Sequence, residues 1–211
     1  MALDGTKAGL RASIKDWIRR TDLTDANCDD FIVLCEREFN RVIRVPAMEV
    51  RDSAFAISAE YTTLPTGFRE MRSILITTDP SHPLKLISPQ AADDFFDYAT
   101  TGTPLNYELV GNAGVLSLRS VPSPDGSYNA DIRYFKAFTA LTDSVTNYIF
   151  DNHCDIYLWG SLLQTAPYVG DDPRIPVWQA KYAAAVKAVI DEGYRSRWSG
   201  SQPMQRIRVN P

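Results

Sequence analysis

The sequence is poor in the residues on which much enzyme chemistry depends. It contains two histidines, His82 and His153, and three cysteines among 211 residues. A histidine-dependent catalytic triad therefore has few candidate bases. The chain also has no P-loop, no GxGxxG motif after a strand, no GxSxG and no HExxH. We expect a non-enzymatic protein with no catalytic and no cofactor-binding residues.

The cysteines are too few and too widely spaced to predict a metal site or a disulfide. Cys28 and Cys35 are seven residues apart in one expected helix, about 10 Å along its axis, which is too far for a disulfide. Buried free thiols are the expectation. A zinc site built from Cys28, Cys35, His153 and Cys154 is an alternative without typical ligand spacing. A nucleophilic pair of Cys154 and His153 is another, disfavoured because adjacent helical residues point in different directions.

No apolar run is long enough to cross a membrane. The most apolar helical stretch, Tyr157 to Val169, is interrupted by Gly160, Ser161, Gln164 and Thr165, whereas a spanning helix needs about 20 apolar residues. Met1 to Leu10 has no apolar core of signal-peptide length. The net charge of −4 gives no general reason to expect a nucleic-acid binder. We expect no membrane association.

Helical periodicity opens the chain. A first helix is expected after Thr6, and a second begins at a cap formed by Thr24 or Asp25 and stops before Pro46. The expected apolar side of the second helix comprises Phe31, Ile32, Cys35, Phe39, Val42 and Ile43. Glu36 and Asn40 are expected on its polar side.

The middle of the chain changes to strand-like periodicity. Between Met48 and about Phe138, six short β-type segments alternate with turn-forming residues. Their number and spacing predict an antiparallel sheet, a sandwich or a small barrel. Leu116 and Leu118 alternate with Ser117 and Arg119, which predicts a strand with its leucines buried and the other two residues in water. One short helix is expected within this region, capped by Ser88 with Pro89 in its first position.

Two further helices are expected after the strands. The first runs from about Phe150 to Tyr168, with Gly170 as its C-cap, and the second from about Asp172 to Arg197. The second carries an apolar stripe of Trp178, Tyr182, Ala185, Val186, Val189 and Ile190. Its other alanines make it slim and allow another helix to approach closely. We take Ala180, Ala184 and Ala188 as a candidate subunit interface, although the core of a helical hairpin would use them equally well.

These patterns together predict an α+β fold. Helical hairpins from the two ends of the chain, residues 1–45 and 148–198, would pack as a four-helix bundle, because each hairpin has an apolar face to bury. Residues 46–147 would form an inserted antiparallel β-rich domain. Residues 199–211 would form an extended C-terminal tail.

Three stretches resemble tailed-bacteriophage head-to-tail adaptor (connector) proteins, in particular the podovirus-type tail tubular protein A group. They are R-x-x-A-M-E from Arg44 to Glu49, L-P-x-x-F-x-E-x-R from Leu64 to Arg72, and D-x-Y-L-x-G-x-L-L-x-x-A-P from Asp155 to Pro167. The resemblance extends from about Leu10 to Trp198.

The resemblance implies a structural virion protein at the head–tail junction, assembled in the host cytoplasm. About twelve neighbouring copies would form a ring that joins the portal protein to the tail nozzle or next tail protein and lets DNA pass without sequence-specific binding. The helical domain would form the ring, and the β-rich insertion would face the next tail component. The tail would reach the portal through Met204, Arg206, Ile207, Arg208 and Val209. Another stopper or tail-completion ring protein, or a tail-associated cell-wall hydrolase, are the alternatives.

Overall fold

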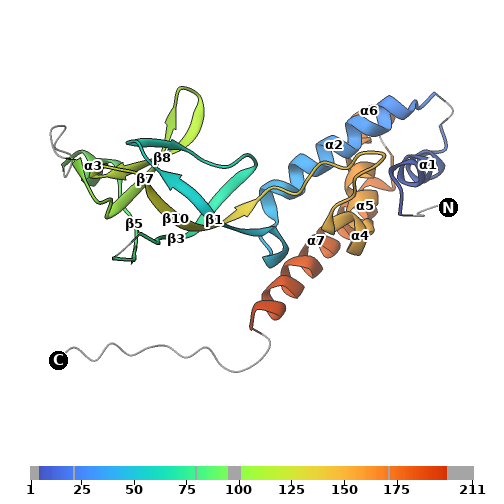
Figure 1. Ribbon diagram of the computed structural model, residues 1–211. Coiled ribbons are helices and arrows are strands. Elements are labelled where there is room, and N and C mark those ends of the chain that lie inside the picture. Colours follow the sequence, from blue (N-terminus) through green and yellow to red (C-terminus); the bar gives the residue numbers. More distant parts are fainter. Residues whose placement is uncertain (1–4, 21, 79, 95–100, 171, 199–211) are drawn as a thin grey trace. The chain divides into compact units, whose positions relative to one another are not determined.

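The computed structural model describes residues 5–20, 22–78, 80–94, 101–170 and 172–198 (Figure 1). The fold is α+β, as the sequence predicts, with helices and several antiparallel sheets. The chain divides into two compact units, residues 1–48 with 138–211, and residues 49–137. We call the first the helical unit and the second the β unit.

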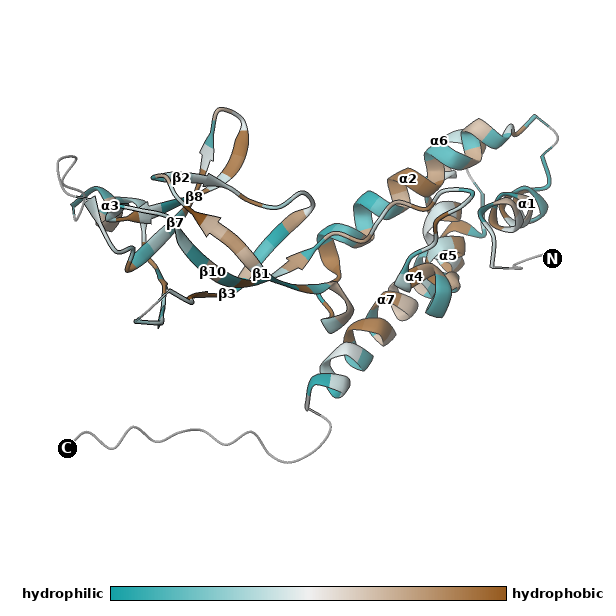
Figure 2. Cartoon of the chain, in the orientation of Figure 1, coloured by the Kyte–Doolittle hydropathy of each residue, from teal (hydrophilic) through white to brown (hydrophobic). Residues whose placement is uncertain are grey.

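The helical unit is built around one central helix. Its described elements are α1 (Lys7–Ile18), α2 (Asp25–Val42), the 3₁₀ helix η1 (Pro46–Met48), α4 (Tyr148–Asn152), α5 (Cys154–Gln164), α6 (Ala166–Val169) and α7 (Ile175–Trp198). Helix α5 packs against α1, α2 and α7. Figure 2 shows the alternating apolar and polar bands along α2 that are typical of an amphipathic helix.

The first two helices begin where their caps predict. The Thr6 hydroxyl accepts a hydrogen bond from the Gly9 backbone N–H at 3.0 Å. Thr24 and Asn27 form a reciprocal capping box at the start of α2. Each cap satisfies backbone donors that a helix leaves unpaired at its first turn. Both caps are therefore confirmed, with Thr24 rather than Asp25 in the second.

The single helix expected from about Phe150 to Tyr168 is wrong. The segment forms α4, α5 and α6, with a break at His153, whose φ of −141° and ψ of 50° are not helical. A second break lies at Thr165, just before Pro167, which has no backbone N–H for a continuous helix. Gly170 ends α6 at a φ of 83°, as expected of a C-cap. Helix α7 starts at Ile175, after Asp172 accepts a hydrogen bond from the Arg174 backbone N–H at 2.8 Å.

Gly160 sets the distance between α5 and two neighbouring helices. A Cβ atom there would lie 2.9 Å from Cε2 of Tyr182 on α7, and closer still to Sγ of Cys35 on α2. Real Cβ atoms essentially never approach other atoms so closely. Packing therefore requires glycine at this position. The backbone conformation does not, because residue 160 lies in ordinary helix.

The polar face expected on α2 is buried at Glu36 and Asn40, which are 6% and 7% exposed. Glu36 Oε1 accepts hydrogen bonds from the Leu141 N–H at 2.7 Å and the Tyr157 hydroxyl at 2.8 Å. Asn40 Oδ1 accepts one from the Phe138 N–H at 2.9 Å. The two side chains therefore satisfy backbone donors of the irregular segment that returns to the helical unit.

The described residues of the β unit form strands arranged in three sheets. Its elements are β1 (Glu49–Ile57), β2 (Tyr61–Thr63), β3 (Phe68–Ile76), β4 (His82–Pro83), β5 (Lys85–Leu86), α3 (Pro89–Asp94), β6 (Thr101–Gly102), β7 (Asn106–Asn112), β8 (Val115–Val121), β9 (Ser123–Pro124) and β10 (Tyr128–Lys136). The strand orders are β1-β10-β3-β4, β2-β8-β7-β5 and β6-β9. The two pairs β5–β7 and β6–β9 are parallel and the other pairs are antiparallel.

Both four-stranded sheets contribute to one apolar core. The core residues are Phe55, Ile57, Leu64, Ile74, Ile76, Leu84, Tyr107, Leu118, Ala130, Ile132 and Tyr134. Because side chains alternate between faces along a strand, each long strand gives part of its residues to this core. The two sheets therefore share one interior, as both the sandwich and the small barrel among the expected alternatives require.

Replacing Gly160 with alanine should lower the free energy of unfolding by about 2 kcal/mol, because the added methyl group forces α2 or α7 away from α5. Chemical denaturation monitored by circular dichroism would measure the loss. Gly111→Ala is the control, since a Cβ there meets nothing within 4 Å. The loss should shrink in a Cys35→Ala background, and an equal loss in both backgrounds would contradict the contact with Cys35.

Replacing Glu36 with glutamine should remove a pH dependence of stability. Burial raises the pKa of Glu36, although hydrogen bonds from Leu141 and Tyr157 oppose the shift. A carboxyl group with a raised pKa in the folded state binds its proton more tightly there. Its contribution to stability is therefore present below the unfolded-state pKa, about 4.3, and falls as the pH rises through the folded-state pKa.

Denaturation at steps of about one pH unit, from roughly pH 4 to 8, would compare the free energy of unfolding of the wild type with that of Glu36→Gln. The wild type should lose stability relative to Glu36→Gln as the pH rises. Leu34→Gln, at an exposed position of α2 with no titratable side chain, is the control and should keep the wild-type slope. Parallel stability curves for the wild type and Glu36→Gln would contradict the prediction.

Candidate functional site

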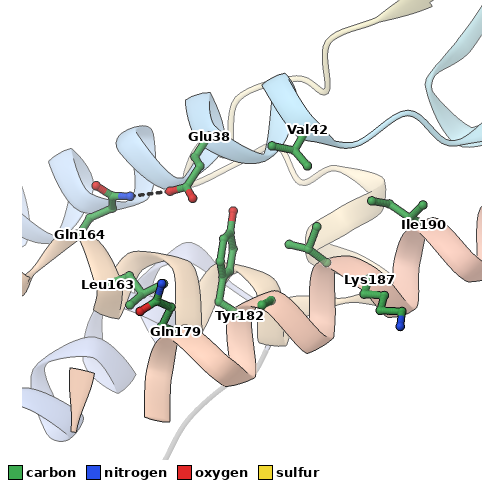
Figure 3. Close-up of a pocket in the computed structure, with 10 residues that line it drawn as sticks. Glu38, Val42, Leu163, Gln164, Gln179, Tyr182, Lys187 and Ile190 are labelled. Atoms are coloured by element: carbon green, nitrogen blue, oxygen red, sulfur yellow. Dashed lines mark hydrogen bonds between the residues drawn. The ribbon is translucent and has the colours of Figure 1, made fainter. Parts of the chain in front are cut away.

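An apolar groove runs along the surface of the helical unit between α2, α5 and α7 (Figure 3). Its volume is about 540 Å³. It is lined by Glu38, Val42, Leu163, Gln164, Gln179, Tyr182, Ala183, Val186, Lys187 and Ile190. Concave apolar surfaces of this size are typical of binding sites.

The groove exposes residues that the hydrophobic pattern predicts to be buried. Val42 is 57% exposed and Ile190 36% exposed, so their expected burial in the single chain is wrong. Tyr182 and Val186, from the same stripe of α7, are buried. The stripe is therefore wider than the core of one chain can cover, and its exposed edge, at Ile190, lines the groove.

Polar groups occur at the rim of the groove. The Gln164 side-chain amide donates a hydrogen bond to Glu38 Oε2 at 2.7 Å, and Lys187 lies further along α7 (Figure 3). Neither Glu38 nor Lys187 forms an ion pair within the described residues. A partner surface with a cation opposite Glu38 and an anion opposite Lys187 could therefore form two ion pairs here.

The predicted interface alanines lie on a second exposed face of α7. Ala180, Ala184 and Ala188 are all exposed, whereas Ala185 is buried. Their use in the hairpin core is therefore wrong for this chain. Val177, on the same face, is 57% exposed. We call Val177, Ala180, Ala184 and Ala188 the alanine face.

The predicted portal-binding residues cannot be placed. Met204, Arg206, Ile207, Arg208 and Val209 lie outside the described residues.

The geometry of the described residues supports neither the zinc site nor the nucleophilic pair considered for the cysteines and His153. Cys28 and Cys35 are buried free thiols, as expected, and burial raises the pKa of both. His153 Nε2 lies 3.8 Å from a carboxylate oxygen of Glu192. No hydrogen bond between described residues joins His153 to Cys154, and the described residues contain no group of three or more His, Cys, Asp or Glu side chains suited to a metal ion.

A charge cluster around the buried Arg119 has a structural role in the β unit. Arg119, 6% exposed, contacts carboxylate oxygens of Glu60 at 2.9 Å, Asp93 at 2.8 Å and Glu108 at 3.0 Å. Burial lowers the pKa of Arg119, but the hydrogen bonds that its guanidinium donates to these carboxylates outweigh that effect and raise it. The cluster ties β8 to β7, to α3 and to the residue before β2.

This cluster overturns the burial predicted for β8. Ser117 and Arg119 are buried, whereas Leu116 is 43% exposed. Arg119 can be buried because three carboxylates replace the water that its guanidinium loses. Leu118 is fully buried, as expected.

The comparison with known families identifies the chain. A family model described as SU10 adaptor protein matches residues 6–206. The chain belongs to the SU10 adaptor protein family. This is a family of structural phage proteins, so the adaptor is a phage structural protein, not an enzyme, and the hydrolase alternative is set aside. A search of curated proteins finds no match.

Family membership places the adaptor in the virion, in association with other phage head and tail proteins. Among the described residues, no helix has the length and apolar character needed to cross a membrane. The head-to-tail adaptor resemblance seen in the sequence is thus confirmed at the level of the phage adaptor. A surface that binds other proteins is the kind of functional site that such a protein requires.

Sequence reasoning missed the groove itself. Its signal was present in the apolar stripe of α7, which includes both Val186 and Ile190 and extends around the helix farther than a narrow seam requires. Only the packing of α2 and α5 against α7 shows which edge of that stripe stays uncovered.

Replacing Arg119 with methionine should lower the free energy of unfolding of the adaptor by about 3–5 kcal/mol, because Glu108 would then be a buried charge without its cation. Thermal unfolding followed by circular dichroism would measure the effect. Arg133→Met, on an exposed position of β10, is the control. Adding Glu108→Gln to Arg119→Met should recover part of the loss, and a stability equal to wild type for Arg119→Met alone would contradict the structural role.

Proposed function

We propose that the adaptor joins the portal protein to the tail nozzle or next tail protein as a ring of about twelve copies, in the manner of podovirus-type tail tubular protein A. The observation that carries this proposal is the uncovered groove in a chain of the adaptor family. Val42 and Ile190 are exposed in the single chain, and contiguous exposed apolar surface marks sites of protein association.

In this proposal the helices supply the wall of the ring. Helices α1, α2, α5 and α7 act as a four-helix bundle made from residues 1–45 and 148–198. The inserted β-rich domain, residues 46–147, faces the next tail component. The packing of α5 against the other three helices supports such a bundle, because buried contacts on several sides make a helix a rigid support for an interface.

The ring encloses part of the passage for DNA. The net charge of −4 favours passage over retention, because affinity for DNA rises with the number of phosphates that Lys and Arg neutralise. The adaptor therefore needs no sequence-specific contact with DNA. The ring is assembled in the host cytoplasm and lies at the head–tail junction of the virion.

The C-terminal tail, residues 199–211, binds the portal. Ile207 and Val209 alternate with Arg206 and Arg208, and Met204 precedes them. This alternation suits an extended segment that adds a strand to the edge of a partner's sheet and places alternate side chains in pockets.

Ending the chain at Gly200 should weaken portal binding by at least about tenfold, or 1.4 kcal/mol, without lowering the stability of the adaptor. Electron microscopy of adaptor mixed with portal rings from the same genome would count stacked rings, and denaturation would measure stability. A second variant replaces Ile207 and Val209 with serine in the full chain, which tests the two apolar side chains without shortening the tail.

Stacked rings with the full chain and their loss with both variants would support the adaptor role and the tail contact. Undiminished stacking by the truncated chain would contradict the role of the tail. No stacking by the full chain at micromolar concentration would contradict portal joining and favour another stopper or tail-completion ring.

A further inference from the structure

Helix α7 carries two uncovered faces, and we propose that they bind each other between neighbouring copies. The groove of one adaptor copy receives the alanine face of α7 from the next copy. The inference deepens the proposed ring and rests on it for the assembly in which the contact forms. The contact joins two different surfaces, the groove on one copy and the alanine face on the next.

The two faces match in shape. The groove is concave and apolar, and Val42, Val186 and Ile190 contribute to its lining (Figure 3). The alanine face is convex and narrow, because its central side chains are methyl groups. Small side chains let two helices approach to the short end of the usual interaxial range, about 8 Å. A helix with this face can therefore approach the floor of the groove closely, whereas the longer side chains of a leucine-rich helix would hold it farther away.

The two faces occupy different parts of the exposed side of the same helix. Successive residues of an α-helix are rotated by roughly 100°. The groove residues Gln179, Ala183 and Ile190 then cluster roughly 125° away from the centre of the alanine face. A contact between such different surfaces is head-to-tail, and each copy keeps one free face for the next. Contacts of this type produce rings when the rotation between copies closes.

The charges beside the two faces are complementary. Along the groove, in the direction of α7, Glu38 comes first, above Tyr182, and Lys187 follows (Figure 3). Along the alanine face, Lys181 comes first and Asp191 follows, about 15 Å later. None of these four side chains forms an ion pair within the described residues.

This order of charges selects one orientation of the neighbouring helix. With the two α7 helices parallel, Lys181 of the incoming copy faces Glu38, and Asp191 lies toward the Lys187 end of the groove, roughly 7 Å beyond the level of Lys187. With the helices antiparallel, charges of the same sign face each other, which is destabilising. A rotation about a ring axis parallel to the helices keeps them parallel, so the favourable orientation is the one that cyclic symmetry produces.

Cysteine cross-linking tests the contact directly. Ala184→Cys places a thiol on the alanine face and Val42→Cys places one in the groove, each in a full chain that also carries Cys154→Ser. Equal amounts of the two variants are mixed, oxidised with copper phenanthroline and separated without reductant. We expect a cross-linked dimer from the mixture only, and a ladder of higher species from a chain carrying both cysteines.

Ala12→Cys, at an exposed position of α1, replaces Ala184→Cys as the matched control and should give no dimer with Val42→Cys. Three other results would overturn the proposal. A dimer from Ala184→Cys alone would indicate a symmetric contact. A cross-link from Val42→Cys to Ile207→Cys would indicate that the tail fills the groove. The third result is the absence of a cross-link between Val42→Cys and Ala184→Cys.

Charge reversal gives an independent measurement. Lys181→Glu and Glu38→Lys should each lower the yield of the cross-linked pair at least about tenfold, and a chain with both changes should recover most of the yield. Lys85→Glu, on an exposed position of the β unit, is the control. Equal losses in the single and double variants would contradict the pairing of Lys181 with Glu38.

The cross-linking is carried out with the adaptor alone and with portal rings from the same genome. Stacking on the portal without the Ala184–Val42 cross-link would overturn this contact and leave the proposed adaptor role standing. The cross-link without stacking would support the contact and contradict the role at the portal. Absence of both would overturn both.

Discussion

The close approach of α5 to α2 and α7 at Gly160 is the contact on which the helical unit depends. With no side chain at this position, Cys35 and Tyr182 occupy the space beside the backbone of α5. The same approach brings α2 and α7 near enough to form the two sides of one groove. A larger residue at position 160 would therefore change both the stability of the unit and the width of its candidate binding surface.

Polar groups in the interior fasten segments that have no regular hydrogen bonding of their own. Glu36 and Asn40 bind backbone N–H groups of Leu141 and Phe138, and Arg119 joins three carboxylates in the β unit. Buried polar groups of this kind are costly when a partner is lost and specify one arrangement when all are paired. Their chemistry is structural, in agreement with a family of phage structural proteins.

The surface that carries the proposed function is apolar, with few charges. In the proposed ring, the groove and the alanine face of α7 are two places where one copy can bury apolar surface on its neighbours. Because they differ in shape and lie at different positions around one helix, each copy could bind two neighbours at once in the proposed ring. The exposed Val42 and Ile190 are then required by assembly, although they add nothing to the fold of a single chain.

The sequence by itself determined the α+β class, the caps at Thr6 and Thr24, and the main strands, since these follow from local hydrogen bonding and from periodicity. The D-x-Y-L-x-G segment also indicated the phage adaptor family. Only the tertiary structure decided that Glu36 and Arg119 are buried and that Val42 and Leu116 are exposed. Periodicity shows which residues share a face, but burial depends on what covers that face, and the covering segments come from distant parts of the chain.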